Sequence, residues 1–286
     1  MIIVMPTCDT HAHVAEWSAA LLKRHWPDHP PLHVLHHDVR PGIPDANLHY
    51  LGADRSFGDW ASRMVEFLAD QGDDTFLIFL DDYALCGPPN AARIADANRL
   101  AHRPDTGFVR LGWQPGTVHP GPDGFVRLGP TLVTMQAAVW RRDYFLKLVE
   151  ASGRCSIWGF EGEGTQAIKR LPGAIYGVDE SGDDSGFFLG ASSSSVLPYR
   201  NLMHRGRLNE AHYDWLIQEG FSPPSRGLGD TIAKAATKIG VAAAVGAVSR
   251  AMGVPCGCGR RQSKLNEIVP YTRSENSGRG GPGPPR

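Results

Sequence analysis

Short apolar segments alternate with amphipathic segments near the start of the chain. The apolar segments are Met1–Met5, Leu32–Asp38 and Thr75–Leu80, each of a length suited to one strand. Between them, residues 12–25 and 59–71 carry apolar side chains at helical spacing. Parallel strands need crossover connections, and helices usually supply them. The pattern therefore predicts the α/β class, with a mostly parallel central sheet flanked by helices.

The middle of the chain continues this alternation. A helix is expected over residues 90–102, and another from Arg142 to a glycine end at Gly153. Two related segments, GFVRLGW (107–113) and GFVRLG (124–129), predict two strands that pair locally around a Gly/Pro turn. The glutamate-containing stretch IWGFEGEG is expected to begin as a loop.

The two ends of the chain differ in charge. Residues 1–225 contain 19 Lys and Arg against 27 Asp and Glu, a net charge of −8, whereas residues 226–286 contain 10 against 3, a net charge of +7. A basic tail of this kind indicates an anionic partner. The two alternatives are nucleic acid, bound through its phosphates, and the acidic body of the same chain.

Composition also divides the chain into segments. We expect a main domain over 1–210, a linker over 211–228, and a third segment over 229–272. The third segment contains an Ala-rich helix, Asp230–Met252, capped at Asp230 and followed by the sequence CGCGRR. The Gly- and Pro-rich residues 273–286 are expected to be disordered.

Five cysteines give no disulfide framework. Cys8, Cys86 and Cys155 are isolated, and Cys256 and Cys258 form either half of a zinc site or a structural turn. The N-terminus has no basic region before its apolar run, and no apolar stretch approaches the roughly 20 residues that span a bilayer. The sequence predicts a protein without transmembrane segments, located in the cytoplasm.

Two adjacent aspartates, Asp81 and Asp82, follow the third apolar segment. Ligands of open α/β sheets bind beyond the carboxyl ends of the strands, which is where these residues fall. Mg²⁺ and Mn²⁺ prefer carboxylate and phosphate oxygens as ligands. A hydrated strand end with no ligand is the alternative interpretation.

Several segments together resemble the nucleotide-sugar-dependent glycosyltransferases of the GT-A fold, in a group that includes bacterial capsular-type enzymes. The resemblance spans about residues 1–210 and lies in the order of five segments: MPTCDTHAHVAEW, SFGDWASRMVEFL, TLVTMQAAVWRRDYFLKLV, IWGFEGEGTQAI and YRNLMHRGRLN. In this chain the acidic motif is Asp-Asp, where Asp-x-Asp is better known. The resemblance implies a GT-A-like fold and transfer of a sugar from a nucleotide-sugar donor to a hydroxyl acceptor.

The resemblance also implies binding residues for the donor. Asp81 and Asp82 would hold Mn²⁺ or Mg²⁺, His204 would be a further metal ligand, and Arg205 would meet the diphosphate. The residues implied near the nucleotide directly follow the first strand: Pro6, Thr7, Cys8 and Asp9.

For catalysis, the resemblance implies that Glu161 takes the proton of the acceptor hydroxyl in an inverting transfer. Glu163 is an equal chemical candidate for the same role. The acceptor would be a glycan or, because CGCGRR…LN…PY resembles a module of phage-encoded proteins, a modified DNA base.

Two other function classes remain open. DTHAH resembles the metal motif of amidohydrolase-type barrels, in which Asp9, His11 and His13 would bind zinc. The third possibility is a non-catalytic phage protein that binds a nucleotide, a glycan or a nucleic acid.

Overall fold

The computed structural model describes most of the chain. The described residues are 1–53, 60–112, 118–129, 133–153, 155–178, 195–204, 206–225, 228–238, 240–241, 244–245 and 258–268. The chain divides into two compact units, Met1–Trp215 and Leu216–Arg286. The finer segment boundaries given by the sequence stay predictions.

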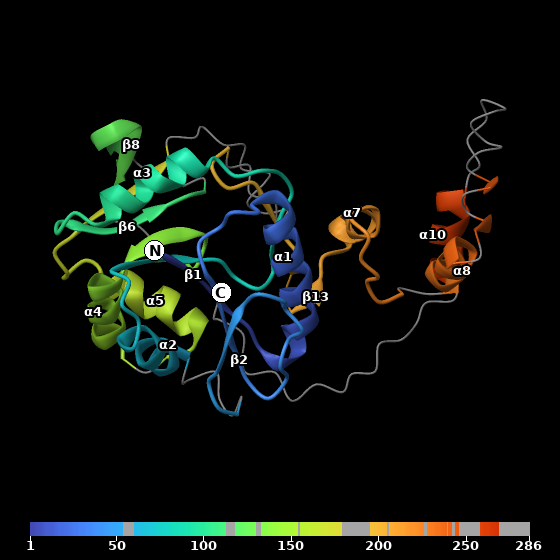
Figure 1. Cartoon of the computed structure of the whole chain (residues 1–286), viewed down its shortest axis with the longest axis horizontal. Coiled ribbons are helices and arrows are strands. Elements are labelled where there is room, and N and C mark those ends of the chain that lie inside the picture. The colour runs from blue at the N-terminus through green and yellow to red at the C-terminus, as the bar shows by residue number, and fades with distance from the viewer. Residues whose placement is uncertain are drawn as a thin grey trace. The chain divides into compact units, whose positions relative to one another are not determined.

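A nine-stranded sheet of order β3-β2-β1-β4-β9-β6-β10-β8-β7 forms the centre of the first unit (Figure 1). Its strands are β1 (Ile2–Pro6), β2 (Leu32–His36), β3 (Asn47–Tyr50), β4 (Thr75–Ile78), β6 (Thr106–Arg110), β7 (Val118–Pro120), β8 (Phe125–Leu128), β9 (Ala138–Arg141) and β10 (Ala174–Val178). Only β8 and β9 are antiparallel to both neighbours, so seven of the nine strands run in one direction. The predicted α/β class with a mostly parallel sheet is confirmed.

Short strands and helices complete the described elements. The short strands are β5 (Tyr83–Leu85), β11 (Tyr199–Asn201), β12 (Met203–His204) and β13 (Arg207–Leu208). The helices are η1 (Asp9–His11), α1 (Ala12–His25), α2 (Trp60–Ala69), α3 (Ala91–Ala101), η3 (Pro122–Gly124), α4 (Arg142–Ser152), α5 (Ile157–Ala167), η4 (Glu210–His212), α7 (Tyr213–Gln218), α8 (Leu228–Lys238) and α10 (Cys258–Ile268). β11 pairs antiparallel with β5, so the chain returns late to the turn after β4.

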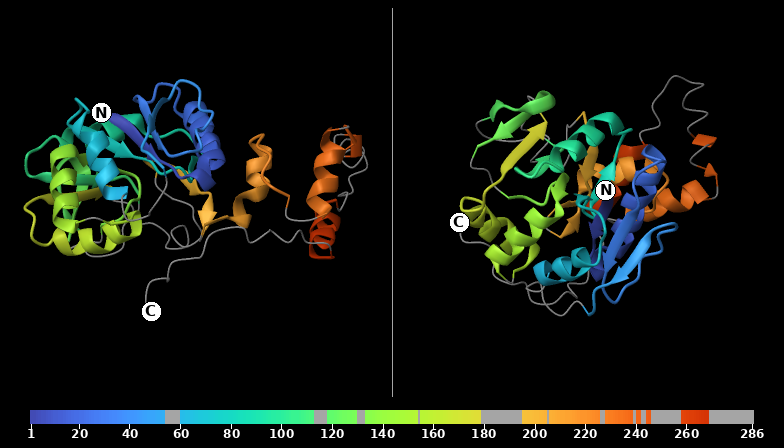
Figure 2. Two further views of the ribbon diagram at one scale, coloured as in Figure 1. Left: turned by 90° about the horizontal axis from the view of Figure 1, so that it is seen from below. Right: turned by 60° about the vertical axis from the view of Figure 1, so that its left-hand side comes forward.

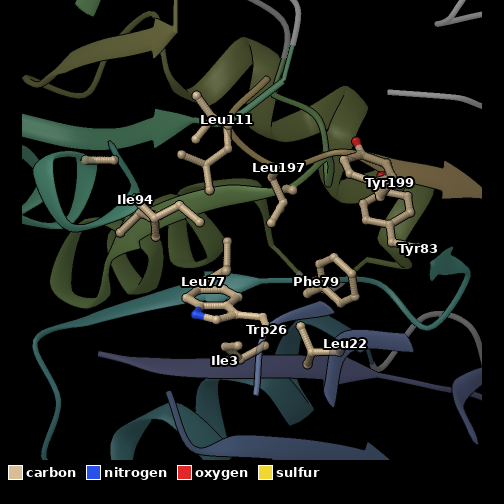
Figure 3. Close-up of a cluster of buried hydrophobic side chains, with 14 of the residues drawn as sticks. Ile3, Leu22, Trp26, Leu77, Phe79, Tyr83, Ile94, Leu111, Leu197 and Tyr199 are labelled. Atoms are coloured by element: carbon tan, nitrogen blue, oxygen red, sulfur yellow. The ribbon is translucent and has the colours of Figure 1, made fainter. Parts of the chain in front are cut away.

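Successive residues of the central strands point to opposite faces, and each face has its own core. Ile3, Leu77 and Phe79 pack on one face with α1 and α3 (Figure 3). Val4 and Phe76 pack on the other face with α2, α4 and α5. Figure 1 shows these last three helices grouped together, with α3 on the other side of β6. The result is a three-layer arrangement of helices, sheet and helices.

The N-terminal strands follow the predicted crossover pattern. β1 pairs in parallel with β2 and β2 with β3, and these blue strands lie next to one another in the right-hand view of Figure 2. Helix α1 has the predicted bounds. Helix α4 ends as predicted at Gly153, which has a φ of 73° and donates its N–H to the carbonyl of Val149 at 3.0 Å.

The predicted local pairing of the two FVRLG segments is wrong. They form β6 and β8, but β10 lies between these strands and pairs with both. β6 and β8 therefore form no hairpin, because the edge of β6 that β8 would have paired with is paired in parallel with β10.

The second unit contains helices α8 and α10. The predicted cap at Asp230 is wrong, because α8 already begins at Leu228. Asp230 is only 1% exposed, and its carboxylate Oδ1 accepts hydrogen bonds from Gln262 and Asn266 of α10, at 2.9 and 2.6 Å. Helix α8 ends at Lys238, and Gly240, with a φ of 77°, interrupts the predicted helix, which is helical again at residues 241, 244 and 245. Cys256 and residues 273–286 lie outside the described residues.

Candidate functional site

The strand order reverses direction between β1 and β4. From β1 the chain moves outward to β2 and β3, and then returns to β4 on the opposite side of β1. In open α/β sheets, ligands bind beyond the carboxyl ends of the strands at such a reversal. Thr7 and Cys8 follow β1 directly, and Asp81 follows three residues after the end of β4. The sequence therefore brings polar residues to the position where this sheet is expected to bind a ligand.

Three side chains meet there, Cys8, His11 and Asp81, which we call the tip cluster. One potential ligand atom from each lies within 4.8 Å of the others. The Thr7 hydroxyl donates to Asp81 Oδ2 at 2.8 Å, and His11 Nδ1 lies 3.5 Å from the same oxygen. Cys8 Sγ lies 3.2 Å from the hydroxyl oxygen of Thr10. The group can hold a metal ion.

The surroundings of His11 strongly shift the pKa of its imidazole. Its hydrogen bond with Asp81, followed by that with Cys8, raises the pKa of His11 to about 10. In the protein without a bound ion, His11 is therefore a cation at neutral pH beside the Asp81 carboxylate. Strongly shifted pKa values of this kind are concentrated at functional sites, which makes the tip cluster a candidate ligand site.

Asp82 has a different environment from its neighbour. Burial, followed by the negative charge of Asp81, raises the pKa of Asp82 to about 7. Its Oδ1 is buried and has no hydrogen-bond partner among the described residues. Its backbone carbonyl accepts the N–H of Leu202 at 2.7 Å. Asp82 is not part of the tip cluster, and its predicted role as a metal ligand stays a prediction.

A second polar group lies at the same edge of the sheet. Arg110 ends β6, which runs in the same direction as β1 and β4. Arg110 is only 3% exposed, and its guanidinium donates to the hydroxyl of Thr134. Burial lowers the pKa of Arg110 to about 10, and the nearby Tyr199 and Glu161 oppose this effect. A charged group this deep needs a specific reason to be there.

Glu161 belongs to this second group. It lies on α5, and its Oε1 accepts the N–H of Met135 at 2.7 Å. Burial raises the pKa of Glu161, while the bond from Met135 and the charge of Arg110 work against the rise. Met135 precedes the antiparallel strand β9, so this contact also falls at the carboxyl edge of the parallel strands.

Tyr83 lies near Asp82 and near the second polar group. Burial raises its pKa well above the usual value, and the charges of Tyr199, Asp82 and Glu161 each raise it further. Its ring stacks on Tyr199 with centroids 4.2 Å apart, and Figure 3 labels both residues. The Tyr83 phenol therefore lies near Glu161 of the second group and near Asp82, the residue that follows Asp81 of the tip cluster.

The remaining residues implied at the donor site have varied positions. Pro6 is buried at the end of β1. Asp9 Oδ1 accepts the N–H of Val39 at 2.7 Å, so it holds the segment after β2. His204 is exposed in β12, and Arg205 lies outside the described residues. The donor contacts assigned to these residues stay predictions.

The expected loop around Glu161 is helix. Helix α5 begins after Ser156, whose side chain accepts the N–H of Gly159 at 3.0 Å as an N-cap. The several glycines of this segment obscured the helix, because they lower helix propensity. Glu163 is exposed, whereas Glu161 points toward the core segment around Met135. The fold thus separates two glutamates that were chemically equal in the sequence.

The amidohydrolase interpretation is wrong. That enzyme class needs a closed barrel, whereas this sheet is open, with β3 and β7 as its edge strands. His13 is exposed on α1 and packs its ring edge-on to Trp17, with centroids 5.2 Å apart. Of the DTHAH residues, His11 alone belongs to the tip cluster.

Sequence reasoning missed Arg110. The available signal was a charged residue at the end of an apolar strand, the same signal that pointed to Asp81. The repeated pentapeptide made it ambiguous, because Arg127 occupies the same place in the second FVRLG segment and is exposed on β8.

Comparisons with known proteins leave the family of the chain open. No family model and no curated protein matches it. Among solved structures, it is similar to a CMP:2-keto-3-deoxy-manno-octonic acid synthetase complexed with CTP, with a TM-score of 0.38 and 12% identity over 62% of this chain and 88% of that one. It is also similar to a mannose-1-phosphate geranyltransferase from Thermus thermophilus, with a TM-score of 0.40 and 13% identity over 62% of this chain and 72% of that one. Such low values assign neither substrate nor reaction to this chain.

Among the described helices, none combines the length and apolar character needed to cross a bilayer. The cytoplasmic location, the relation of the C-terminal segment to phage-encoded proteins and the anionic partner of the basic tail all stay predictions.

Proposed function

We propose that the chain is a nucleotide-sugar-dependent glycosyltransferase that moves a sugar to a hydroxyl acceptor. One observation supports this best: a group able to hold a cation and the Glu161 carboxylate, which contacts Met135 just before β9, both lie at the carboxyl edge of the parallel strands. Glycosyl transfer needs both parts, a positive charge for the leaving diphosphate and a base for the acceptor.

On the donor side, Asp81 is the residue proposed to hold the cation, with Thr7 fixing its carboxylate. A divalent ion bound there would neutralise the negative charge that develops on the diphosphate as it leaves. The sequence prediction for this ion is Mn²⁺ or Mg²⁺, with Asp82 and His204 as further ligands and Arg205 on the diphosphate. The nucleotide would lie along the segment that follows β1.

On the acceptor side, Glu161 is the proposed base. Met135 fixes Oε1, and Oε2 is the oxygen proposed to take the proton of the attacking hydroxyl. Burial raises the pKa of Glu161, which makes the carboxylate a stronger base than a solvated one. A single base that activates the acceptor for direct attack gives inversion at the anomeric carbon.

An exposed aromatic residue supports a carbohydrate acceptor. Trp158 is 71% exposed and lies three residues before Glu161 on α5, so the two share one side of the helix. Exposed tryptophan offers a flat apolar face with a polar edge, which suits the faces of a sugar ring. We propose that Trp158 positions a glycan acceptor next to the base.

A donor screen tests the proposed function. The purified full-length chain is incubated with UDP- and GDP-sugars, glycan acceptors, and Mg²⁺, Mn²⁺ or Zn²⁺ in separate reactions. Release of nucleoside diphosphate with a glycosylated acceptor is the expected result. Pyrophosphate exchange would instead identify nucleotidyl transfer, and nucleotide binding without turnover would identify the non-catalytic alternative.

A further inference from the structure

The donor atoms of the tip cluster are unusual for the ions that the sequence prediction names. Mg²⁺ and Mn²⁺ are held mainly by carboxylate, phosphate and water oxygens. Here the three groups that converge are a thiol, an imidazole and a carboxylate, from Cys8, His11 and Asp81. Thiolate and imidazole ligands favour zinc, and Mn²⁺ stands lowest in the general affinity order of the divalent first-row metals.

We propose that Cys8, His11 and Asp81 form a zinc site, with one further coordination position left for a substrate oxygen. Zinc sites that act on substrates have three protein ligands and one open position. A thiolate and a carboxylate together also balance the two positive charges of the ion. Zinc binding itself does not depend on the proposed glycosyl transfer, whereas a catalytic role for the ion rests on it.

Two separate segments build this site, so it exists only in the folded chain. Cys8 directly precedes η1 and His11 is its last residue, and the His11 N–H donates to the Cys8 carbonyl at 2.9 Å. Asp81 comes from the turn after β4. The parallel pairing of β1 with β4 brings these two turns together, which reduces the ordering that metal binding requires.

Neighbouring hydroxyl groups provide the outer contacts that metal ligands usually have. Thr7 donates to Asp81 Oδ2 and so fixes the carboxylate, and the Thr10 hydroxyl lies at hydrogen-bond distance from Cys8 Sγ. Contacts of this kind orient ligands and typically change metal affinity about 10–100-fold when removed. The cluster is also partly open, with the His11 side chain 22% exposed, so a substrate can reach it.

Cobalt substitution tests the site without reference to activity. Chelator-treated full-length protein, carrying Cys256→Ser and Cys258→Ser to remove the thiols of the tail, is titrated with Co²⁺. We expect a sulfur-to-cobalt charge-transfer band at one ion per chain. Zn²⁺ should abolish it at equal concentration, and a large excess of Mn²⁺ should leave it intact.

Three matched pairs of variants assign the ligands. Cys8→Ser should lose the band while Cys86→Ser keeps it, and His11→Ala should weaken binding while His13→Ala does not. Asp81→Asn should weaken Co²⁺ binding more than Asp82→Asn does. Thr7→Val should lower affinity by about 10-fold or more. Circular dichroism on each variant shows whether the fold is kept.

The outcomes separate this inference from the proposed function. Absence of the band, its survival in folded Cys8→Ser, or its equal loss with Mn²⁺ would overturn the zinc site. Glycosyl transfer with Mn²⁺ that Cys8→Ser leaves unchanged overturns a catalytic role for zinc and keeps the proposed function. Zinc bound at the three residues with no transfer from any donor keeps the site and removes the proposed function.

Discussion

The tip cluster lies in turns that directly follow β1 and β4, whereas Glu161 and Arg110 come from a helix and a distant strand. The first group is partly open to solvent, and each of its members has a polar neighbour. The second is drier, with Arg110 only 3% exposed. One edge of the sheet therefore has an accessible polar group and a desolvated one, and the two tasks proposed for them, ion binding and proton transfer, need opposite environments.

Glu161→Gln is expected to have the largest effect. Removing a general base typically lowers kcat by about 10²–10⁴-fold. Steady-state kinetics with the active donor should show this loss, while Co²⁺ binding at the tip cluster is unchanged. Glu163→Gln, on the exposed side of the same helix, should keep full activity. Equal losses in both variants would remove the distinction between the two glutamates.

Asp82→Asn should stabilise the protein in the absence of metal. The folded pKa of Asp82 is about 7, above its ordinary 3.8, so the folded state holds this proton more tightly than the unfolded chain. The native protein therefore loses stability as the pH rises from 4 to 7, mainly because Asp82 is buried, with the charge of Asp81 adding to the effect and His11 opposing it.

The Asp82→Asn variant does not lose stability in this way as the pH rises. Its advantage in the free energy of unfolding should grow over the same pH range to roughly 2–4 kcal/mol. Urea unfolding at several pH values, with chelator present, measures the difference. An advantage that is already complete at pH 4 would show that charge is not its cause.

Arg110→Gln is expected to move the pH dependence of kcat. The positive charge of Arg110 lowers the pKa of Glu161, so its removal raises that pKa further. Because activity requires the deprotonated base, the acid limb of the pH–kcat profile should shift to higher pH. Arg127→Gln, which changes the exposed arginine of the related pentapeptide, is the control and should not move the limb.

Trp158→Ala should have the smallest effect. The residue is exposed and proposed to contact the acceptor, so we expect a KM for the acceptor that is several-fold higher with little change in kcat. The KM for the donor should stay the same. A fall in kcat without a change in acceptor KM would place Trp158 in support of α5 instead of at the acceptor.

The sequence was sufficient for the parts of the fold that depend on nearby residues. The alternation of apolar and amphipathic segments predicted the parallel β1–β4 region and the bounds of α1. It also placed Asp81 at the carboxyl end of a strand, where open sheets bind ligands, whereas the position of Thr7 and Cys8 near a ligand was implied by the family resemblance. The position of Asp81 was thus predictable, whereas His11 was considered as a metal ligand only in an amidohydrolase-type motif with Asp9 and His13.

Features that depend on distant partners were not predictable in the same way. The pentapeptide FVRLG occurs twice, yet Arg110 is buried on a central strand and Arg127 is exposed near the sheet edge. Their surroundings differ because β10, far along the chain, pairs with β6 on one side and β8 on the other. Glu161 and Glu163 are equivalent in the sequence in the same way. Their environments differ only because the packing of α5 brings Glu161 to the N–H of Met135.

The hydrogen bond from Leu202 to the carbonyl of Asp82 has a consequence for biosynthesis. Strand β11 pairs with β5, which follows the two aspartates directly. Because β11 lies more than 100 residues further along the chain, it is synthesised long after β5. A nascent chain that has left the ribosome only as far as β10 has the main sheet but lacks the partner that secures this acidic turn. During translation, the turn that carries Asp81 therefore gains this hydrogen bond only after the synthesis of a segment that supplies none of the three tip-cluster side chains.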